Sequence, residues 1–250
     1  MKIRIKFRKY GTMKFIGHLD VMRFFQKAIR RAGIPIAYTE GFSPHQIMSF
    51  AAPLGVGLTS DGEYLDIVCR DEAFLPGADP SVPHTAKQIR DALNGVMVEG
   101  MEIVQVCRLP EGAGNAMASV AAARYQVSFR EGYEPEVDWT SQLPAFYAQS
   151  TIPVTKKTKK SVKEFDLKTF LYELFIAQTP EGPVIEMLVD ASSAGNVKPS
   201  LVIEAFYHKN GLESVPEAAL LIHRKETYGD RGSVERHCFV PLSDFGEDFE

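Results

Sequence analysis

A strict alternation of charged and apolar side chains over residues 2–8 is the feature that most constrains the fold. The apolar members are Ile3, Ile5 and Phe7, and the cations are Lys2, Arg4, Lys6 and Arg8. A period of two predicts a half-buried strand with a basic outer face. Because the apolar face of a strand must pack against another layer, the segments that follow must supply that layer.

The next segment has the periodicity of an amphipathic helix that starts near His18 or Leu19 and runs to Ala32. Its apolar stripe is formed by Leu19, Met22, Phe25, Ile29 and Ala32. Gly33 and Pro35 then stop the helix. The opposite side is basic and carries Arg23, Lys27, Arg30 and Arg31. The sequence therefore predicts a helix that buries one face and presents cations on the other.

The remaining patterns of the first half complete the order β-α-β-β-α-β. Strands are expected at 34–39, 63–70 and 101–106, and a second helix at 84–94. A similar rhythm returns after a Gly/Ala-rich segment, with strands at 125–129, 172–177, 184–190 and 220–228 and helices at 139–148 and 199–207. This order is typical of an α+β fold with two ferredoxin-like (βαββαβ) halves and antiparallel sheets. The predicted domains are 1–108 and 123–250, joined by a linker at 109–122.

Composition is that of an ordinary globular protein, since 45% of the 250 residues are hydrophobic and 24% are charged. No apolar run approaches the roughly 20 residues that a membrane span needs, and the N-terminus lacks the apolar segment of a signal peptide. We therefore expect a cytoplasmic protein without a membrane partner. The cysteines, Cys69, Cys107 and Cys238, lack the close spacing of an iron–sulfur motif and are expected to be buried structural thiols.

Three separate elements are basic, namely the first strand, the first helix and a lysine run at 156–163, and aromatic residues lie between them. Phosphates need cations and unpaired bases need stacking partners, so the combination favours RNA binding. Taken one at a time, however, each basic element is explained equally well as an ordinary charged surface in contact with solvent. The candidate RNA-binding residues are Lys14, Arg23, Lys27, Arg30, Arg31, Glu40, Phe42, Ser43, His45, Lys156, Lys157, Lys159 and Lys160.

His18 and His45 are the candidates for general acid–base catalysis. Asp20, in the first turn of the predicted helix, is better explained as a residue that stabilises the helix terminus. No Ser-His-Asp order, P-loop or dinucleotide-binding motif is present, and no two ligands have the tight spacing of a metal site. We therefore expect neither a metal nor a cofactor in this chain.

The motifs KFIGHLD, RRAGIPIAYTEGFSPH, SFAAPLGVG and GEYLD resemble a bacterial domain family of unknown function that is labelled radical SAM-linked or radical SAM-associated. The resemblance is dense over about residues 1–70 and looser over most of the remaining chain. The matching positions include Lys14, His18, Asp20, Arg30, Arg31, Gly33, Glu40, Gly41, Phe42, Pro44, His45, Gly57 and Asp66. The family has no established catalytic residues, so none can be carried over.

What the resemblance implies is a partner. Members are encoded beside, or fused to, a radical SAM protein with a cobalamin-binding-like domain, often near genes for ribosomes and RNA processing. This chain lacks the CxxxCxxC triad of a radical SAM enzyme. We therefore favour an accessory or substrate-presenting subunit, without catalysis of its own, that binds RNA or a ribosome-linked substrate for that enzyme. The alternatives are a stand-alone RNA-cleaving or RNA-modifying enzyme that uses His18 and His45, and a protein–protein adaptor that docks through its apolar loop 50–56.

Overall fold

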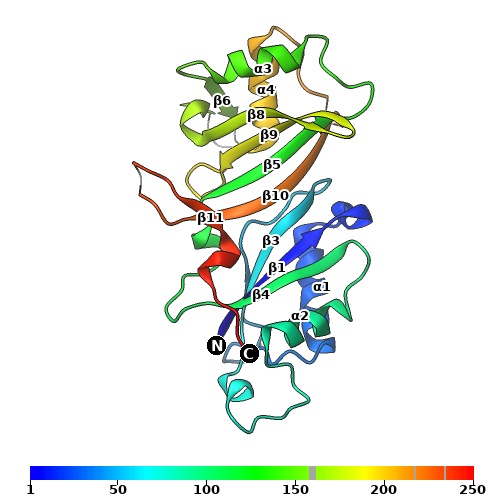
Figure 1. The fold of residues 1–250 in the computed structure, drawn as a ribbon, viewed down its shortest axis with the longest axis vertical. Helices are drawn as coiled ribbons and strands as arrows, with labels where there is room; N and C mark the ends of the chain where they lie inside the picture. Colours follow the sequence, from blue (N-terminus) through cyan, green and yellow to red (C-terminus); the bar gives the residue numbers. More distant parts are fainter. Residues whose placement is uncertain (158–161, 217, 234) are drawn as a thin grey trace. The chain divides into compact units, whose positions relative to one another are not determined.

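The computed structural model describes residues 1–157, 162–216, 218–233 and 235–250, with helices and antiparallel strands in two compact units (Figure 1). The first unit contains Met1–Ala121 and Glu226–Glu250, and the second contains Ala122–Lys225. The predicted second domain, in contrast, runs to residue 250. The chain returns to the first unit because its last segment contributes the buried side chain of Phe249 to the first core. The segment predicted to be a linker, residues 109–122, lies almost entirely in the first unit.

The first unit has a central antiparallel sheet. Its elements are β1 (Lys2–Lys9), α1 (His18–Arg31), β2 (Met48–Phe50), β3 (Thr59–Val68), α2 (Ala86–Asn94), β4 (Met101–Arg108), the end of β10 (Leu220–Asp230) and β11 (Phe239–Pro241). β1 lies between β4 and β3, and β2 pairs with the other edge of β3. Short 3-10 turns occupy Gly11–Phe15, Asp71–Phe74, Met117–Ser119 and Leu242–Phe245.

Both helices of the first unit cover the same face of this sheet. Phe25 and Ile29 of α1 and Ile89 of α2 are fully buried in one cluster with Ile3 and Ile5 of β1. The rings of Phe7 and Phe25 lie 4.8 Å apart. The side of β1 that the alternation marks as apolar is therefore the side that the helices cover, as expected.

The second unit has its own antiparallel sheet and core. Its elements are β5 (Ala122–Phe129), α3 (Trp139–Tyr147), β6 (Pro153–Lys157), β7 (Val162–Asp166), a 3-10 turn (Leu167–Phe170), β8 (Leu171–Thr179), β9 (Gly182–Asp190), α4 (Pro199–Lys209) and the start of β10. β9 pairs with β5 and β8, while β6 and β7 form a separate hairpin. Phe146 of α3 packs against Phe206 of α4.

The fold class is thus mixed, with a mostly antiparallel sheet and four α-helices among the described residues. The first helix ends one residue before its predicted end, where Gly33 has the positive φ of +66° that a helix stop uses. The predicted strand at 34–39 is wrong, since Ile36 and Tyr38 make only isolated bridges. Pro35 removes a backbone donor there, which limits pairing.

Candidate functional site

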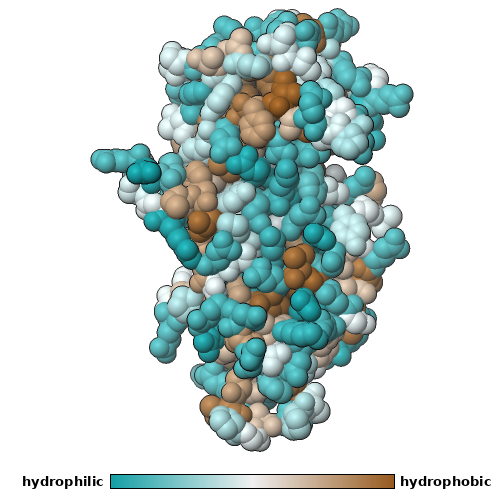
Figure 2. All heavy atoms as spheres, in the orientation of Figure 1, coloured by the Kyte–Doolittle hydropathy of each residue, from teal (hydrophilic) through white to brown (hydrophobic). Residues whose placement is uncertain are grey.

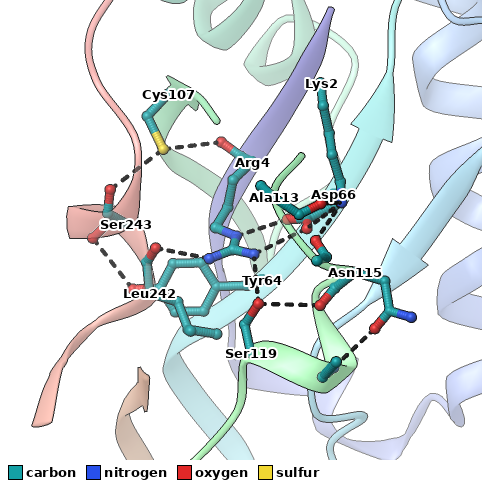
Figure 3. Close-up of polar contacts among 12 residues, drawn as sticks. Lys2, Arg4, Tyr64, Asp66, Cys107, Ala113, Asn115, Ser119, Leu242 and Ser243 are labelled. Carbon is teal, nitrogen blue, oxygen red and sulfur yellow. Dashed lines mark hydrogen bonds and ion pairs between the residues drawn. The ribbon is translucent and has the colours of Figure 1, made fainter. Parts of the chain in front are cut away.

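The outer face of β1, which the sequence marks as basic, is neutralised inside the first unit (Figure 3). Arg4 is buried, and its Nε and Nη2 atoms donate to the two carboxylate oxygens of Asp66 at 2.7 and 3.0 Å. Its Nη1 atom donates to the carbonyl oxygen of Leu242 at 3.0 Å. The guanidinium is therefore held by the end of the chain as well as by β3, and it serves the fold.

The other cations of this strand face are also paired with acids. Lys6 forms an ion pair with Glu226, whose second oxygen accepts from the hydroxyl of Tyr64 at 2.7 Å. Burial, followed by the charge of Glu226, raises the pKa of Tyr64. Arg8 lies within 3.4 Å of both Asp61 and Glu102. The strand face therefore offers little free positive charge to a phosphate.

The cations of α1 have a different environment. The helix buries Val21, Phe25, Ala28 and Ile29, and its exposed residues are Leu19, Asp20, Arg23, Lys27, Arg30 and Arg31. The prediction that Leu19 belongs to the buried stripe is wrong, since its side chain is 62% exposed. Arg23 pairs with Asp20 at 3.3 Å, with both side chains about two-thirds exposed, and Arg31 donates to the carbonyl of Val96. Lys27 and Arg30 have no hydrogen-bonding or ionic partner among the described residues. The helix thus presents two cations that no acid neutralises within the part of the chain that the structure describes.

A tightly bonded loop follows α1. The backbone N–H of Thr39 donates to the carbonyl of His45 at 2.9 Å, and the N–H of His45 donates to the Thr39 hydroxyl at 3.1 Å. Gly41 has a φ of +108°, which a residue with a side chain rarely adopts. The tip carries Phe42, which is fully exposed. The loop is therefore an ordered platform that presents a bare aromatic ring.

Gln46 joins this loop to the helix. Its side chain is buried, and its Nε2 atom donates to the backbone oxygen of Gln26 at 3.2 Å and to the hydroxyl of Tyr38 at 3.5 Å. The Tyr38 ring, 46% exposed, is thereby linked to α1 at the residue before Lys27. We call the set Arg23, Lys27, Arg30, Tyr38 and Phe42 the α1–loop surface.

Among the other predicted site residues of this region, Glu40 and Ser43 are exposed in the loop. Lys14 lies in the 3-10 turn before α1, with its ammonium group 5.2 Å from the centre of the Phe15 ring. Lys156 and Lys157 belong to β6, but their side chains lie outside the described part of the chain, as do Lys159 and Lys160 altogether.

The two candidate catalytic histidines occupy different environments. His18 lines a cavity of about 10 Å³, and its ring meets that of Phe50 edge to face at 5.1 Å. His45 is exposed, and its Nδ1 atom lies 3.1 Å from the Thr39 hydroxyl. No hydrogen bond or ring contact joins the two histidines in the described residues. No group of three potential metal ligands is present in that part of the chain either.

Sequence reasoning missed two buried charged residues in the same cavity, Lys9 and Glu63. The Nζ atom of Lys9 donates to the carbonyl of Ile16 at 2.8 Å. Burial lowers the pKa of Lys9, and the charge of Glu63 opposes that shift. The sequence does indicate the burial of Lys9, because this residue lies two positions after Phe7 and so continues the inward face of the strand.

The expectation of three buried thiols holds for two of them. Cys69 and Cys107 are buried, which raises the pKa of Cys69 to about 12 and that of Cys107 to about 11. Cys238 is exposed, so the prediction is wrong for this residue. None of the described residues just before β11, 231–233 and 235–238, belongs to either core, and side-chain periodicity does not reveal this.

The loop 50–56, predicted as an apolar docking surface in the adaptor alternative, is partly internal. Phe50, Ala51 and Leu54 are buried, and Phe50 belongs to the core under α1. Val56 is 61% exposed. The face drawn in Figure 2 is largely hydrophilic, with apolar side chains gathered in separate patches. None of the helices in the described ranges has the length and apolar character required to cross a membrane.

Comparisons with known proteins give a family but no activity. The model of a family described as "Uncharacterized protein conserved in bacteria (DUF2344)" matches residues 2–199. No curated protein matches the chain. A solved structure titled "Crystal Structure of a Cbf5-Nop10-Gar1 Complex" is similar at 10% identity with a TM-score of 0.44, over 90% of this chain and 48% of that one. This chain therefore spans about half the length of that structure's chain.

Proposed function

The chain belongs to DUF2344, a family of uncharacterized proteins conserved in bacteria, and we propose that it is an accessory subunit that binds RNA on the α1–loop surface. The observation that carries the proposal is the contrast between two basic surfaces of one unit. The outer-face cations of β1 (Lys2, Arg4, Lys6 and Arg8) are each paired with an acid, whereas Lys27 and Arg30 of α1 have no such partner among the described residues. Unpaired exposed cations beside exposed aromatic rings are the combination that phosphates and unpaired bases require.

The exposed cations of α1 give the helix an electrostatic basis for binding RNA. Three cations, Arg23, Lys27 and Arg30, recur at three- and four-residue spacing on one side of α1 and so follow one line along the helix. Such a line can contact consecutive phosphates of a nucleic-acid backbone. The net charge of the whole chain is −4, so RNA affinity has to come from a local surface of this kind.

The proposed partner is a radical SAM protein with a cobalamin-binding-like domain. Support comes from the resemblance of the first seventy or so residues and from the cysteine spacing, which lacks the triad that would hold the cluster. In this scheme the partner supplies the chemistry and the present chain holds the RNA, or a ribosome-linked substrate, in the cytoplasm. We also infer a ferredoxin-like arrangement for each unit, which the antiparallel pairing around β1 and around β9 supports.

A salt titration of RNA binding tests the proposal. The purified chain is expected to bind a fluorescein-labelled RNA at low salt, and the logarithm of the association constant should fall with the logarithm of salt concentration. Three phosphate contacts predict a slope of about −2, at about −0.7 per contact on a single strand. Absence of binding at low salt, or an affinity that salt does not change, would contradict the proposal and favour a protein–protein adaptor.

One observation favours the rival enzyme. His18 shares its cavity with Glu63 and with Lys9, whose pKa is lowered by burial, and a titratable group perturbed in this way at a cleft is one indication of an acid–base site. An enzyme of this kind would cleave or modify RNA without a partner, and His18→Ala would abolish that activity while the fold persists. If neither the wild-type chain nor His18→Ala cleaves or modifies RNA, and the two bind RNA equally well, the accessory role is favoured.

A further inference from the structure

In addition to its cations, the α1–loop surface carries two exposed aromatic rings. Phe42 is fully exposed at the tip of the loop, and Tyr38 is 46% exposed beside α1. An isolated exposed aromatic residue is unremarkable. Here, however, the Thr39–His45 hydrogen bonds fix the loop that carries Phe42, and Tyr38 directly precedes that loop.

The loop is fixed relative to the cations of the same unit. Gln46 bonds to Tyr38 and to the backbone of Gln26, one residue before Lys27. Gln46 thus holds Tyr38 beside α1, and Phe42 lies in the bonded loop that directly follows Tyr38. A ring that is ordered before binding loses little conformational freedom when a ligand covers it.

We propose that this surface selects single-stranded RNA over duplex RNA by stacking unpaired bases on Phe42 and Tyr38 while the α1 cations contact the phosphates. The inference rests on the proposed RNA-binding function and specifies its substrate. Bases in a duplex are stacked on each other, so a protein ring cannot reach their faces unless the strand is open. Aromatic platforms beside cations are how sequence-tolerant single-strand binders gain affinity.

The chemistry of the surface also indicates tolerance of base sequence. Every base has a π-face, so stacking on Phe42 does not distinguish among the four bases strongly. Phe42 has no hydrogen-bonding group in its side chain. The recognised unit is therefore a short unpaired segment with at least two accessible bases, such as a loop or a strand end.

The test measures fluorescence anisotropy with two probes. One is a labelled, unstructured single-stranded RNA of about 12 nucleotides, a length within the site sizes of single-strand binders, and the other is the same strand annealed to its complement. The wild-type chain should bind the single strand more tightly. Phe42→Ala should weaken single-strand binding by about 5-fold or more, the effect of losing one stacked base, and should leave duplex binding unchanged.

Matched variants separate stacking from other effects. Tyr38→Phe keeps the stacking ring and removes only the hydroxyl that accepts from Gln46, so it should lose less single-strand affinity than Tyr38→Ala, which removes the ring as well. Phe175→Ala removes an aromatic ring of similar exposure from the second unit and should have no effect. Because Phe42 is fully exposed, its removal does not threaten folding, and circular dichroism would verify this.

Equal affinity of the wild-type chain for the two probes would overturn the inference, as would full single-strand affinity in Phe42→Ala. In either case salt-sensitive binding would remain, and the proposed RNA-binding function would stand. Failure to bind either probe at low salt would overturn the proposed function and the inference together.

Discussion

Arg4 and Asp66 face each other across β1 and β3 and form a two-point ion pair, with N–O distances of 2.7 and 3.0 Å and both side chains buried. A buried charge that loses its partner is far more costly than the pair itself is stabilising. We therefore expect Asp66→Asn to lower the free energy of unfolding by about 3–5 kcal/mol. Urea denaturation followed by circular dichroism would measure the change.

The matched control is the ion pair of Arg108 and Glu247, in which both side chains are about half exposed or more. Glu247→Gln should lower the free energy of unfolding by less than about 1 kcal/mol, because solvent screens an exposed pair. Similar effects of the two variants would contradict the structural role that we assign to Arg4 and Asp66.

Lys9 gives a pH-dependent prediction. Burial lowers its pKa in the folded chain below the ordinary value of 10.5. Between the lowered pKa and 10.5 the unfolded chain holds a proton that the folded chain has released, so Lys9 makes the folded state more stable as pH rises. The difference in unfolding free energy between the wild type and Lys9→Met should therefore increase as pH rises through the alkaline range toward 10.5.

Urea midpoints of both proteins across that range provide the measurement. Contributions from other titrating groups are largely common to the two proteins and cancel in the difference. A difference that stays constant or decreases with pH would indicate that the ammonium group is not penalised by burial.

The thiols should differ in reactivity. Burial raises the pKa of Cys69 to about 12 and that of Cys107 to about 11, so both stay protonated and covered near neutral pH. Cys238 is exposed. A thiol-disulfide reagent should modify Cys238 alone in the native chain and all three cysteines in denaturant. Cys238→Ser should abolish the native reaction, and rapid labelling that persists in this variant would contradict the burial of the other two thiols.

The loop that carries Phe42 depends on the Thr39 hydroxyl, which accepts from the backbone N–H of His45 at 3.1 Å. Thr39→Val keeps the shape of the side chain but removes this acceptor, and it should weaken single-strand RNA binding because the loop loses its fixed form. Thr39→Ser keeps the hydroxyl and should bind like the wild type. Anisotropy titrations would measure both, and equal affinities of the two variants would contradict a positioning role for Thr39.

Local features of the sequence predicted the local structure well. The periodicity of residues 19–32, with Gly33 and Pro35 after it, placed α1 to within one residue of its observed end. The same pattern placed Arg23, Lys27 and Arg30 on the exposed side. These features depend on the spacing of side chains along one helix, which a sequence displays directly.

Long-range features could not be predicted in this way. The alternation of β1 indicated a basic outer face, but whether Arg4 would be exposed depends on Asp66 and on Leu242, which lies far along the chain. The return of Glu226 to the first unit also depends on its bonds to Lys6 and Tyr64. The spacing of side chains along one strand or helix does not indicate which distant residue each side chain will contact, so these pairings could not be predicted from it.

The most direct test of the central claim is a comparison of two charge-reversed proteins that have the same net charge. Lys27→Glu/Arg30→Glu alters the two α1 cations that lack a partner among the described residues. Lys198→Glu/Lys209→Glu alters two exposed cations, one at the N-cap of α4 and one at its last residue. We predict that the α1 variant loses at least about 10-fold in RNA affinity at low salt and that the magnitude of its salt slope falls by about 1.4, at about 0.7 per lost phosphate contact. The α4 variant should bind nearly as well as the wild type. Equal losses in the two variants, or no loss in the α1 variant, would contradict an RNA-binding surface on α1.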